Sequence, residues 1–290
     1  MSRFRACHHH IDLTSRVLVM GVLNVTPDSF SDGGMYLDPA QAVDRVACMI
    51  EEGADIIDIG GESTRPRAYP VDEQEELRRL RPVLQAVGHR SEVPISIDTQ
   101  KSSVASMALD LGAVIVNDVS ALRHDPNMAK VVAEARAGLV LMHMQGIPET
   151  MQESPEYRDV VGEVKDFLSA RMAIAVQTGI QEESILLDPG IGFGKTIEHN
   201  LMLVSQCVQL AALGRPILVG LSNKEFIGKI IGKPVGGRVI GTAAAVAIAI
   251  FQGANIIRVH DVAVMREAMN IAQALAAANA WSQPSRQEQL

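Results

Sequence analysis

Basic residues, aromatic residues and long apolar runs are all scarce in this chain of 290 residues. Lysine and arginine total 26 against 34 aspartates and glutamates, so the net charge is −8, and aromatic residues make up 3%. Nucleic-acid binders need a basic face and often aromatic stacking platforms, so no nucleic-acid partner is expected. The longest uncharged stretch, residues 239–257, is interrupted by polar and small residues. It predicts a buried helix that runs into a strand, and no membrane association is expected.

Cysteine is also rare, and its three positions follow no recognisable spacing. Cys7, Cys48 and Cys207 are odd in number and lack the patterns of a disulfide framework or a zinc site. They are expected to be small apolar residues in a reducing compartment. The first residues lead into no apolar segment, so no signal peptide is expected. With 47% apolar residues, the composition indicates a soluble cytoplasmic protein with a large core.

Eight short apolar runs alternate with amphipathic stretches along the chain. Apolar runs without polar alternation are typical of parallel strands that are covered on both faces. Between them, Asp38 and Pro39 predict the start of a helix that ends at Gly53, and Asp72 with Glu75 predicts a cap for another. Eight strand–helix units favour an α/β fold of the (β/α)₈ TIM-barrel type over an open doubly wound sheet. The predicted strands are residues 17–23, 56–60, 95–98, 114–118, 139–143, 185–188, 217–220 and 256–260.

No linker or low-complexity segment divides the chain, so residues 1–290 are predicted to form one domain. Its core covers about residues 12–280, and the tail after Trp281 is expected to fray. His8, His9 and His10 resemble a metal-ligand cluster or an engineering remnant. An N-terminal hairpin that closes the bottom of the barrel is the preferred interpretation of this segment.

Polar or ionisable residues follow every predicted strand, whereas plain turns precede the strands. In a barrel the carboxyl ends of all strands meet at one mouth, where active sites lie. The sequence therefore predicts an active site there, and two loops rich in Gly, Pro and hydroxyl residues, 26–34 and 63–70, are expected to act as lids. The strand-end residues are Asn24, Glu62, Asp98, Asn117, Asp118, His143, Asp188, Ser222, Arg258 and His260.

The charged groups of this mouth allow two interpretations. The acidic set is Asp98, Asp188 and possibly Asp118, and the cationic set is Arg65, Lys224, Arg258 and His260. All could pair as internal salt bridges. Alternatively, the carboxylates could bind the N–H donors of a heterocycle while the cations hold an anion. Asn24 offers a neutral oxygen that suits Mg²⁺ with water and phosphate as its other ligands.

The Gly-rich segment 190–196 fails both phosphate-binding patterns that it resembles. A Walker A loop requires glycine at Pro189, and a dinucleotide-binding fingerprint requires glycine at Lys195. The segment instead predicts a close-packed turn that places Phe193 over the mouth.

Four segments together resemble the signatures of the dihydropteroate synthase family, over about residues 12–275. They are residues 20–34, 58–66, 187–195 and 258–261. The resemblance implies a Mg²⁺-dependent transferase of folate biosynthesis. Such an enzyme joins 6-hydroxymethyl-7,8-dihydropterin diphosphate to 4-aminobenzoate and releases diphosphate and 7,8-dihydropteroate. It would react through a dissociative, SN1-like pterin cation. The family is a target of sulfonamides, which mimic aminobenzoate, and the resemblance leaves both sensitivity and resistance open for this chain.

The resemblance also assigns roles to residues of this sequence. The expected catalytic residues are Asp98, Asp188, Lys224 and Arg65. The pterin would contact Asp98, Asn117, Asp188 and Lys224, and the diphosphate Thr64, Arg258, Val259 and His260. The aminobenzoate would contact Thr64, Pro66, Phe193 and Ser222, and Asn24 would bind magnesium. Members of the family are commonly homodimers through their last helices, so a homodimer is expected.

One departure from the family pattern stands after the seventh strand, where Ser222-Asn223-Lys224 replaces the usual Ser-Arg-Lys. The change removes a cation near the pterin site, and Arg67 is a candidate to compensate for it. This departure motivates one alternative to the active synthase, a non-catalytic pterin-binding paralogue. A second alternative is a pterin-dependent methyltransferase.

Overall fold

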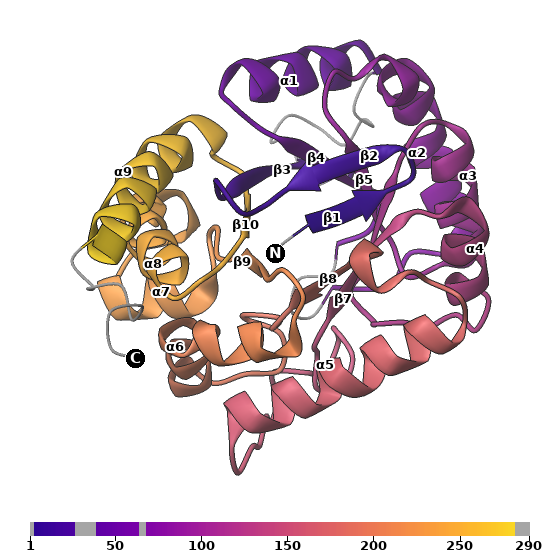
Figure 1. Cartoon of the computed structure of the whole chain (residues 1–290). Helices are drawn as coiled ribbons and strands as arrows, with labels where there is room; N and C mark the ends of the chain where they lie inside the picture. The colour runs from indigo at the N-terminus through magenta and orange to yellow at the C-terminus, as the bar shows by residue number, and fades with distance from the viewer. Residues whose placement is uncertain (1–2, 27–38, 64–67, 282–290) are drawn as a thin grey trace, which may run out of the picture.

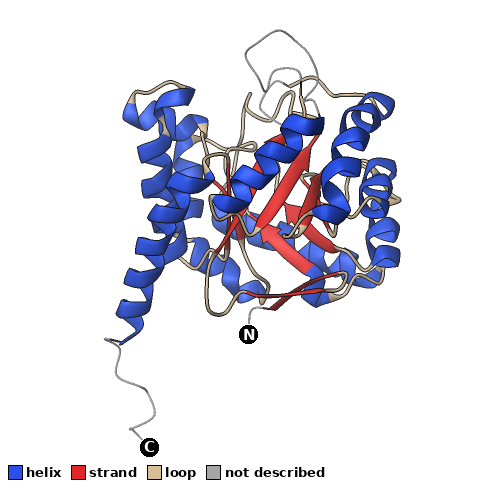
Figure 2. Ribbon diagram, turned by 90° about the horizontal axis from the view of Figure 1, so that it is seen from above, coloured by secondary structure: helices blue, strands red, loops and turns tan. Residues whose placement is uncertain are grey.

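The computed structural model describes residues 3–26, 39–63 and 68–281 of the chain. Eight parallel strands in these residues form one sheet, in the order β8-β7-β6-β5-β4-β3-β10-β9. A bridge between Leu187 and Ile217 links its two edges, so the sheet closes into a barrel surrounded by helices (Figure 1 and Figure 2). The (β/α)₈ TIM barrel is confirmed. Its strands are β3 (Leu18–Asn24), β4 (Ile56–Gly60), β5 (Ile95–Asp98), β6 (Ile115–Asp118), β7 (Gly138–Met142), β8 (Ile185–Asp188), β9 (Leu218–Gly220) and β10 (Ile256–Val259).

All the strand boundaries lie within one residue of the prediction. The difference matters at His143 and His260, which lie just beyond the strands that were predicted to contain them. The strands were identifiable because nearly every residue in them is buried, as a parallel sheet covered on both faces requires.

The helices begin and end where the sequence supplies caps. The Asp72 carboxylate accepts a hydrogen bond of 2.9 Å from the Glu75 backbone N–H, as predicted. Gly53, beyond the end of α1, has a φ of +98°, a conformation that favours glycine. The helix α2 continues through Pro82 and ends at Val87. The helices are α1 (Pro39–Glu51), α2 (Glu73–Val87), α3 (Ser102–Asp110), α4 (Met128–Ala135), α5 (Val160–Gln177), α6 (Ile197–Ser205), α7 (Glu225–Ile231), α8 (Val239–Phe251) and α9 (Val262–Trp281).

An antiparallel hairpin, β1 (Arg3–Ala6) and β2 (His9–Asp12), closes the bottom of the barrel (Figure 1). Phe4 is buried against Leu18 and Ile256, the first residues of β3 and β10. At Gly138, where β7 begins, a Cβ atom would lie 2.4 Å from the Phe4 ring, so the hairpin packs where glycine leaves room. The predicted hairpin is thus confirmed. Among the described helices, none is long and apolar enough to cross a membrane.

Candidate active site

One arginine joins two carboxylates from separate strands at the open end of the barrel. Arg258 of β10 donates from Nε to Oδ2 of Asp58 at 2.6 Å, and from Nη2 to Oδ2 of Asp98 at 2.7 Å. Both carboxylates are buried, Asp58 completely. Charge-assisted hydrogen bonds of this kind are short and strong, and they fix the plane of the guanidinium. The interpretation in which the charged groups pair internally therefore holds for Arg258.

Asn117 belongs to the same group of polar residues. It lies beside Asp98 in the register of β5 and β6, and its Nδ2 donates to Oδ2 of Asp58 at 3.1 Å. Oδ1 of Asp98 and Oδ1 of Asp58 are buried and have no hydrogen-bond partner within the described residues. Buried acceptors are nearly always paired in folded proteins. These oxygens are therefore positions at which water or the N–H groups of a ligand can donate.

Burial and the charges of neighbouring groups set the pKa values of Asp98 and Arg258. Burial raises the pKa of Asp98 to about 7; Arg258 acts against this and Asp58 adds to it. Burial alone would lower the pKa of Arg258, but the charges of Asp58 and Asp98 raise it, so the guanidinium stays charged. One cation thus faces two carboxylates, which leaves Asp98 prone to bind a proton near neutral pH.

Asp188, the last residue of β8, approaches the mouth from another side of the barrel. Its Oδ1 accepts a hydrogen bond of 2.7 Å from the Gly190 backbone N–H, and the side chain is buried. Burial raises the pKa of Asp188, while the Gly190 bond and the charge of Lys224 act against the increase. The carboxylate is thus held in place by its own loop.

Lys224 and Phe193 are in contact, and the charge of Lys224 also acts on Asp188. The Lys224 Nζ lies 4.4 Å from the centre of the Phe193 ring, a cation–π contact. Ser222 and His260 also meet, because Oγ of Ser222 lies 3.0 Å from Nδ1 of His260. The structure thus brings the ends of β8, β9 and β10 together at one place.

Two strand-end residues have roles other than those predicted. Asp118 was considered as an inward-facing carboxylate, but it accepts hydrogen bonds from the backbone N–H groups of Ser120 at 2.8 Å and Leu122 at 2.7 Å. Neighbouring residues of a strand face opposite sides, so Asn117 points to the barrel and Asp118 to its own loop. His143 is buried, and its Nδ1 lies 3.0 Å from Nζ of Lys195. Both residues shape loops.

Several predicted residues make no side-chain hydrogen bond within the described residues or lie beyond the described ranges. Asn24 ends β3 beside Gly60, and its side chain is half-buried with no hydrogen bond to the described residues. Val259 ends β10 and is buried. The predictions for Thr64, Arg65, Pro66 and Arg67 lie outside the described residues, as do most of the first lid and part of the second.

Asn223 has a backbone conformation that agrees with its identity. Its φ is +59°, in the left-handed region that asparagine tolerates better than most residues other than glycine. The Arg238 guanidinium donates to the Asn223 carbonyl oxygen at 2.8 Å. The turn before Lys224 is therefore stabilised without an arginine at position 223.

Three residues have contacts that the sequence did not single out: Asp58 and Lys195 near the strand ends, and Tyr157 in the segment before α5. Asp58 is a lone carboxylate within an apolar strand, and such an isolated charge is a signal of a buried partner. Lys195 breaks a glycine pattern and ends the signature segment 187–195, but neither feature indicates its contact with His143. No local pattern indicates Tyr157, because its contacts come from loop packing.

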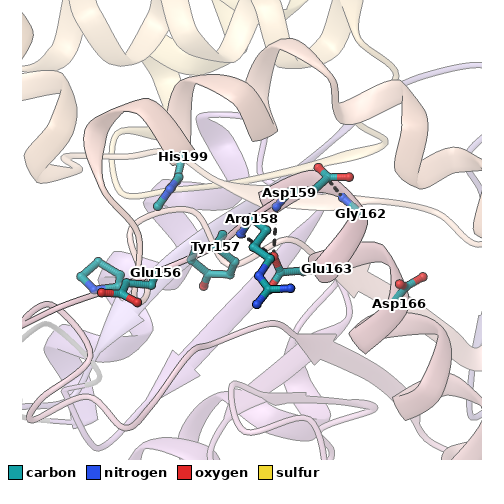
Figure 3. Close-up of a pocket in the computed structure, with 9 residues that line it drawn as sticks. Glu156, Tyr157, Arg158, Asp159, Gly162, Glu163, Asp166 and His199 are labelled. Carbon is teal, nitrogen blue, oxygen red and sulfur yellow. Dashed lines mark hydrogen bonds between the residues drawn. The ribbon is translucent and has the colours of Figure 1, made fainter.

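A surface hollow of about 920 Å³ lies away from the strand ends, between α5, α6 and the segment before α5. Tyr157, Arg158, Glu163 and His199 are among its lining residues (Figure 3). None of the predicted site residues lines it. It is therefore distinct from the mouth.

Comparisons with known proteins agree with this geometry. The pterin binding enzyme family model matches residues 20–260. The dihydropteroate synthase of Synechocystis sp. is 47% identical over 91% of this chain and 92% of its own length. That of Escherichia coli K12 is 46% identical over 88% and 90%.

Solved structures give the same result. The Yersinia pestis dihydropteroate synthase with a sulfonamide drug superposes with a TM-score of 0.90, at 44% identity, over 95% of this chain and 99% of that one. The Xanthomonas albilineans enzyme with 4-aminobenzoic acid gives a TM-score of 0.88 at 42% identity, over 97% and 99%. The chain therefore belongs to the pterin-binding enzymes and, within them, to the dihydropteroate synthase family of transferases.

Proposed function

We propose that this protein condenses 6-hydroxymethyl-7,8-dihydropterin diphosphate with 4-aminobenzoate, giving 7,8-dihydropteroate and diphosphate. The observation that carries the proposal is the grouping of buried acceptors and cations at one mouth: Asp98, Asn117 and Asp188 beside Arg258 and Lys224. The Xanthomonas albilineans relative was solved with 7,8-dihydropteroate, the product of this reaction.

The pterin is proposed to bind inside the barrel. Asp98 and Asp188 carry acceptor oxygens for the ring N–H groups, and Asn117 and Lys224 carry donors. Pairing a carboxylate with ring N–H donors contributes about 1.5–3 kcal/mol for each charge-assisted bond. The unpartnered Oδ1 of Asp98 supports this placement, because a ligand donor would satisfy a buried acceptor.

The aminobenzoate and the diphosphate are proposed to bind nearer the rim. The Phe193 ring, backed by Met142 and Met144, offers an apolar wall for the aromatic ring, with Ser222 beside it. Arg258, Val259 and His260 are assigned to the diphosphate, and Thr64, Arg65 and Pro66 complete these sites. Arg258 has one guanidinium nitrogen, Nη1, that is not used in its bonds to Asp58 and Asp98.

The chemistry that suits this site is dissociative. The dihydropterin is electron-rich, so its C–O bond can ionise before the amine attacks. Asp188 and Asp98 stabilise the positive charge that spreads over the ring, while the cations at the rim hold the departing diphosphate. Asn24 would hold Mg²⁺ through its amide oxygen, and the bound metal would supply positive charge to neutralise part of the diphosphate charge. Asn24 fits this role because its amide has no partner within the described residues and Mg²⁺ accepts few protein ligands.

The proposed function is tested by measuring diphosphate release and dihydropteroate formation with both substrates and Mg²⁺. Turnover that a sulfonamide inhibits is the expected result. Pterin binding without turnover would favour the non-catalytic paralogue. That alternative is based on Asn223, which stands where the family usually has arginine. Methyl transfer from methyltetrahydrofolate would favour the methyltransferase.

We further propose that the protein is a cytoplasmic homodimer whose interface lies on α8 and α9. Apolar side chains project from this face without covering residues: Ile240 is 85% exposed, Ile271 65% and Leu275 56%. The two helices pack against each other, and exposed apolar side chains on adjoining helices are a feature of interfaces between proteins. Light scattering on Ile240→Glu is expected to give a monomer where the parent is a dimer; a monomeric parent would reject the interface.

A further inference from the structure

The loop that carries Phe193 lies unusually close to the loop before it. The β8 loop (residues 189–195) has glycine at positions 190, 192 and 194, with φ values of +66°, +84° and +61°. A Cβ atom on Gly190 would lie 1.8 Å from the His143 carbonyl oxygen, and one on Gly194 would lie 2.6 Å from the Gln145 carbonyl oxygen. The backbone of the β8 loop therefore rests on the β7 loop (residues 143–159), and side chains at these glycines would separate the two.

Side chains bind three successive carbonyl oxygens of the β8 loop. Gln152 Nε2 donates to the Gly192 oxygen at 2.7 Å, and the Tyr157 hydroxyl donates to the Gly194 oxygen at 2.8 Å. Between them, Lys195 Nζ donates to the Phe193 oxygen at 2.9 Å. Two donors belong to the β7 loop and the third to the β8 loop itself. The peptide units on both sides of the Phe193 Cα are thus fixed.

Lys195 is fully buried and carries a second link between the loops. Its Nζ lies 3.0 Å from Nδ1 of His143, the first residue of the β7 loop. Burial together with the charges of Lys195 and Arg123 lowers the pKa of His143 to about 2, so its imidazole is neutral and can accept a hydrogen bond. A buried amine needs such partners, because an unpaired charge inside a protein is costly.

The donor end of the β7 loop is itself rigid. Oε1 of Glu163, in the first turn of α5, accepts from the backbone N–H groups of Arg158 at 2.7 Å and Asp159 at 3.0 Å (Figure 3). The Asp159 carboxylate accepts from the Gly162 N–H at 3.1 Å (Figure 3). Tyr157 is therefore held next to a helix end, and its hydroxyl is a fixed anchor for the β8 loop.

We propose that Gln152, Tyr157 and Lys195 are positioning residues that set the place of the Phe193 ring and thereby the affinity for 4-aminobenzoate. The inference rests on the proposed function, in which Phe193 forms a wall of the aminobenzoate site. It extends that function to residues of the β7 loop for which no substrate contact is assigned. The distance of 4.4 Å between Lys224 Nζ and the Phe193 ring depends on the same restraint.

The test removes one donor at a time and measures both substrates separately. Tyr157→Phe deletes only the hydroxyl, and Gln152→Leu deletes the amide. Gln209→Leu is the matched control, because Gln209 is exposed and bonds only to Gln206. In each of the two test variants the KM for 4-aminobenzoate is expected to rise about three- to tenfold, the range for losing one hydrogen bond. The KM for the pterin diphosphate is expected to stay at the control value, even where the unpaired carbonyl oxygen lowers the Tm by a few degrees.

A purely structural role would give a different pattern. It would lower the Tm and leave both KM values unchanged, or raise both equally, and either result would overturn the proposal. A sulfonamide provides a second readout, because its inhibition constant is expected to rise in parallel with the aminobenzoate KM. Unchanged inhibition in both variants would also count against the proposal.

Failure of this inference is distinguishable from failure of the proposed function. If the parent protein forms no dihydropteroate from both substrates, the proposed function fails first. If the parent turns over normally and both variants keep the parent KM for aminobenzoate, only the positioning role is wrong.

Discussion

Arg258 and Asp98 are 160 positions apart in the sequence, yet Nη2 of one lies 2.7 Å from Oδ2 of the other. The family resemblance assigns the arginine to an anion site and the carboxylate to a ring site. The ion pair joins these two sites, and Asp58, which accepts from Nε of the same guanidinium, extends the link. A ligand that binds to Asp98 therefore changes the charge environment of Arg258, and the reverse also holds.

The pH dependence of pterin binding is expected to report on this group. The Asp98 pKa of about 7 means that the carboxylate binds a proton as the pH falls through neutrality. A protonated carboxyl offers fewer acceptor sites for the N–H groups of the pterin and stabilises a cation less. The kcat/KM for the pterin diphosphate is therefore expected to decline below about pH 7, measured from pH 5 to 9.

Asp58→Asn tests whether Asp58 contributes to that pKa. The substitution removes a neighbouring negative charge and leaves Arg258 to a single carboxylate, and both effects lower the pKa of Asp98. The acid limb of the profile is expected to move to lower pH by roughly one unit. If the acid limb of Asp58→Asn lies at the same pH as that of the parent protein, Asp58 does not raise the pKa of Asp98.

Asp188 is expected to contribute mainly to turnover. Asp188→Ala removes the carboxylate that faces the developing cation, and stabilisation of this type is worth about 100- to 1,000-fold in rate. The kcat is therefore expected to fall by at least about two orders of magnitude while the circular dichroism spectrum is preserved. Near-normal kinetics in the variant would refute the role.

The strands and the barrel could be predicted because their determinants are local. Apolar runs such as Ile95–Asp98 reveal a buried parallel strand, and an Asp72–Glu75 pair reveals a helix cap. Chain order in a barrel then places the strand ends at one mouth. The strands and the mouth can therefore be located without knowledge of any side-chain contact.

The contacts within the mouth could not be predicted in the same way. Arg258 could pair with a carboxylate of the protein or stay open to a ligand anion. The outcome depends on how side chains from three strands are directed, and no local sequence pattern encodes those directions. The orientation of Asp118 could have been inferred from the alternation of neighbouring residues along β6, with Asn117 facing the barrel. The bond from Tyr157 to Gly194 comes from packing between loops and has no sequence signal.

Removal of the metal is expected to abolish turnover and addition of Mg²⁺ to restore it. If Asn24 supplies a ligand oxygen, Asn24→Ala raises the Mg²⁺ concentration needed for half-maximal rate by roughly tenfold, equivalent to about 1.4 kcal/mol. Asn24→Asp keeps an oxygen at the same place and serves as the control. Equal Mg²⁺ requirements in Asn24→Ala and the parent would show that another group binds the metal.

Lys195 is expected to make stability depend on pH in the alkaline range. Burial lowers its pKa to about 7, from an ordinary value of 10.5 in the unfolded chain. Between these values the unfolded state binds more protons than the folded state, so the free energy of unfolding rises with pH from about 7 to about 10.5 through this group. Below about pH 7 both states carry the charge, and this contribution to the pH dependence vanishes.

Lys195→Met removes the titrating amine and keeps most of the buried volume. The difference in unfolding free energy, parent minus variant, is expected to increase between pH 7 and pH 9.5, because only the parent gains stability there. Urea unfolding at the two pH values measures it. Lys130→Met on the exposed side of α4 is the matched control and is expected to show no such change. A parent-minus-variant difference that is equal at both pH values would mean that Lys195 keeps its ordinary pKa inside the protein.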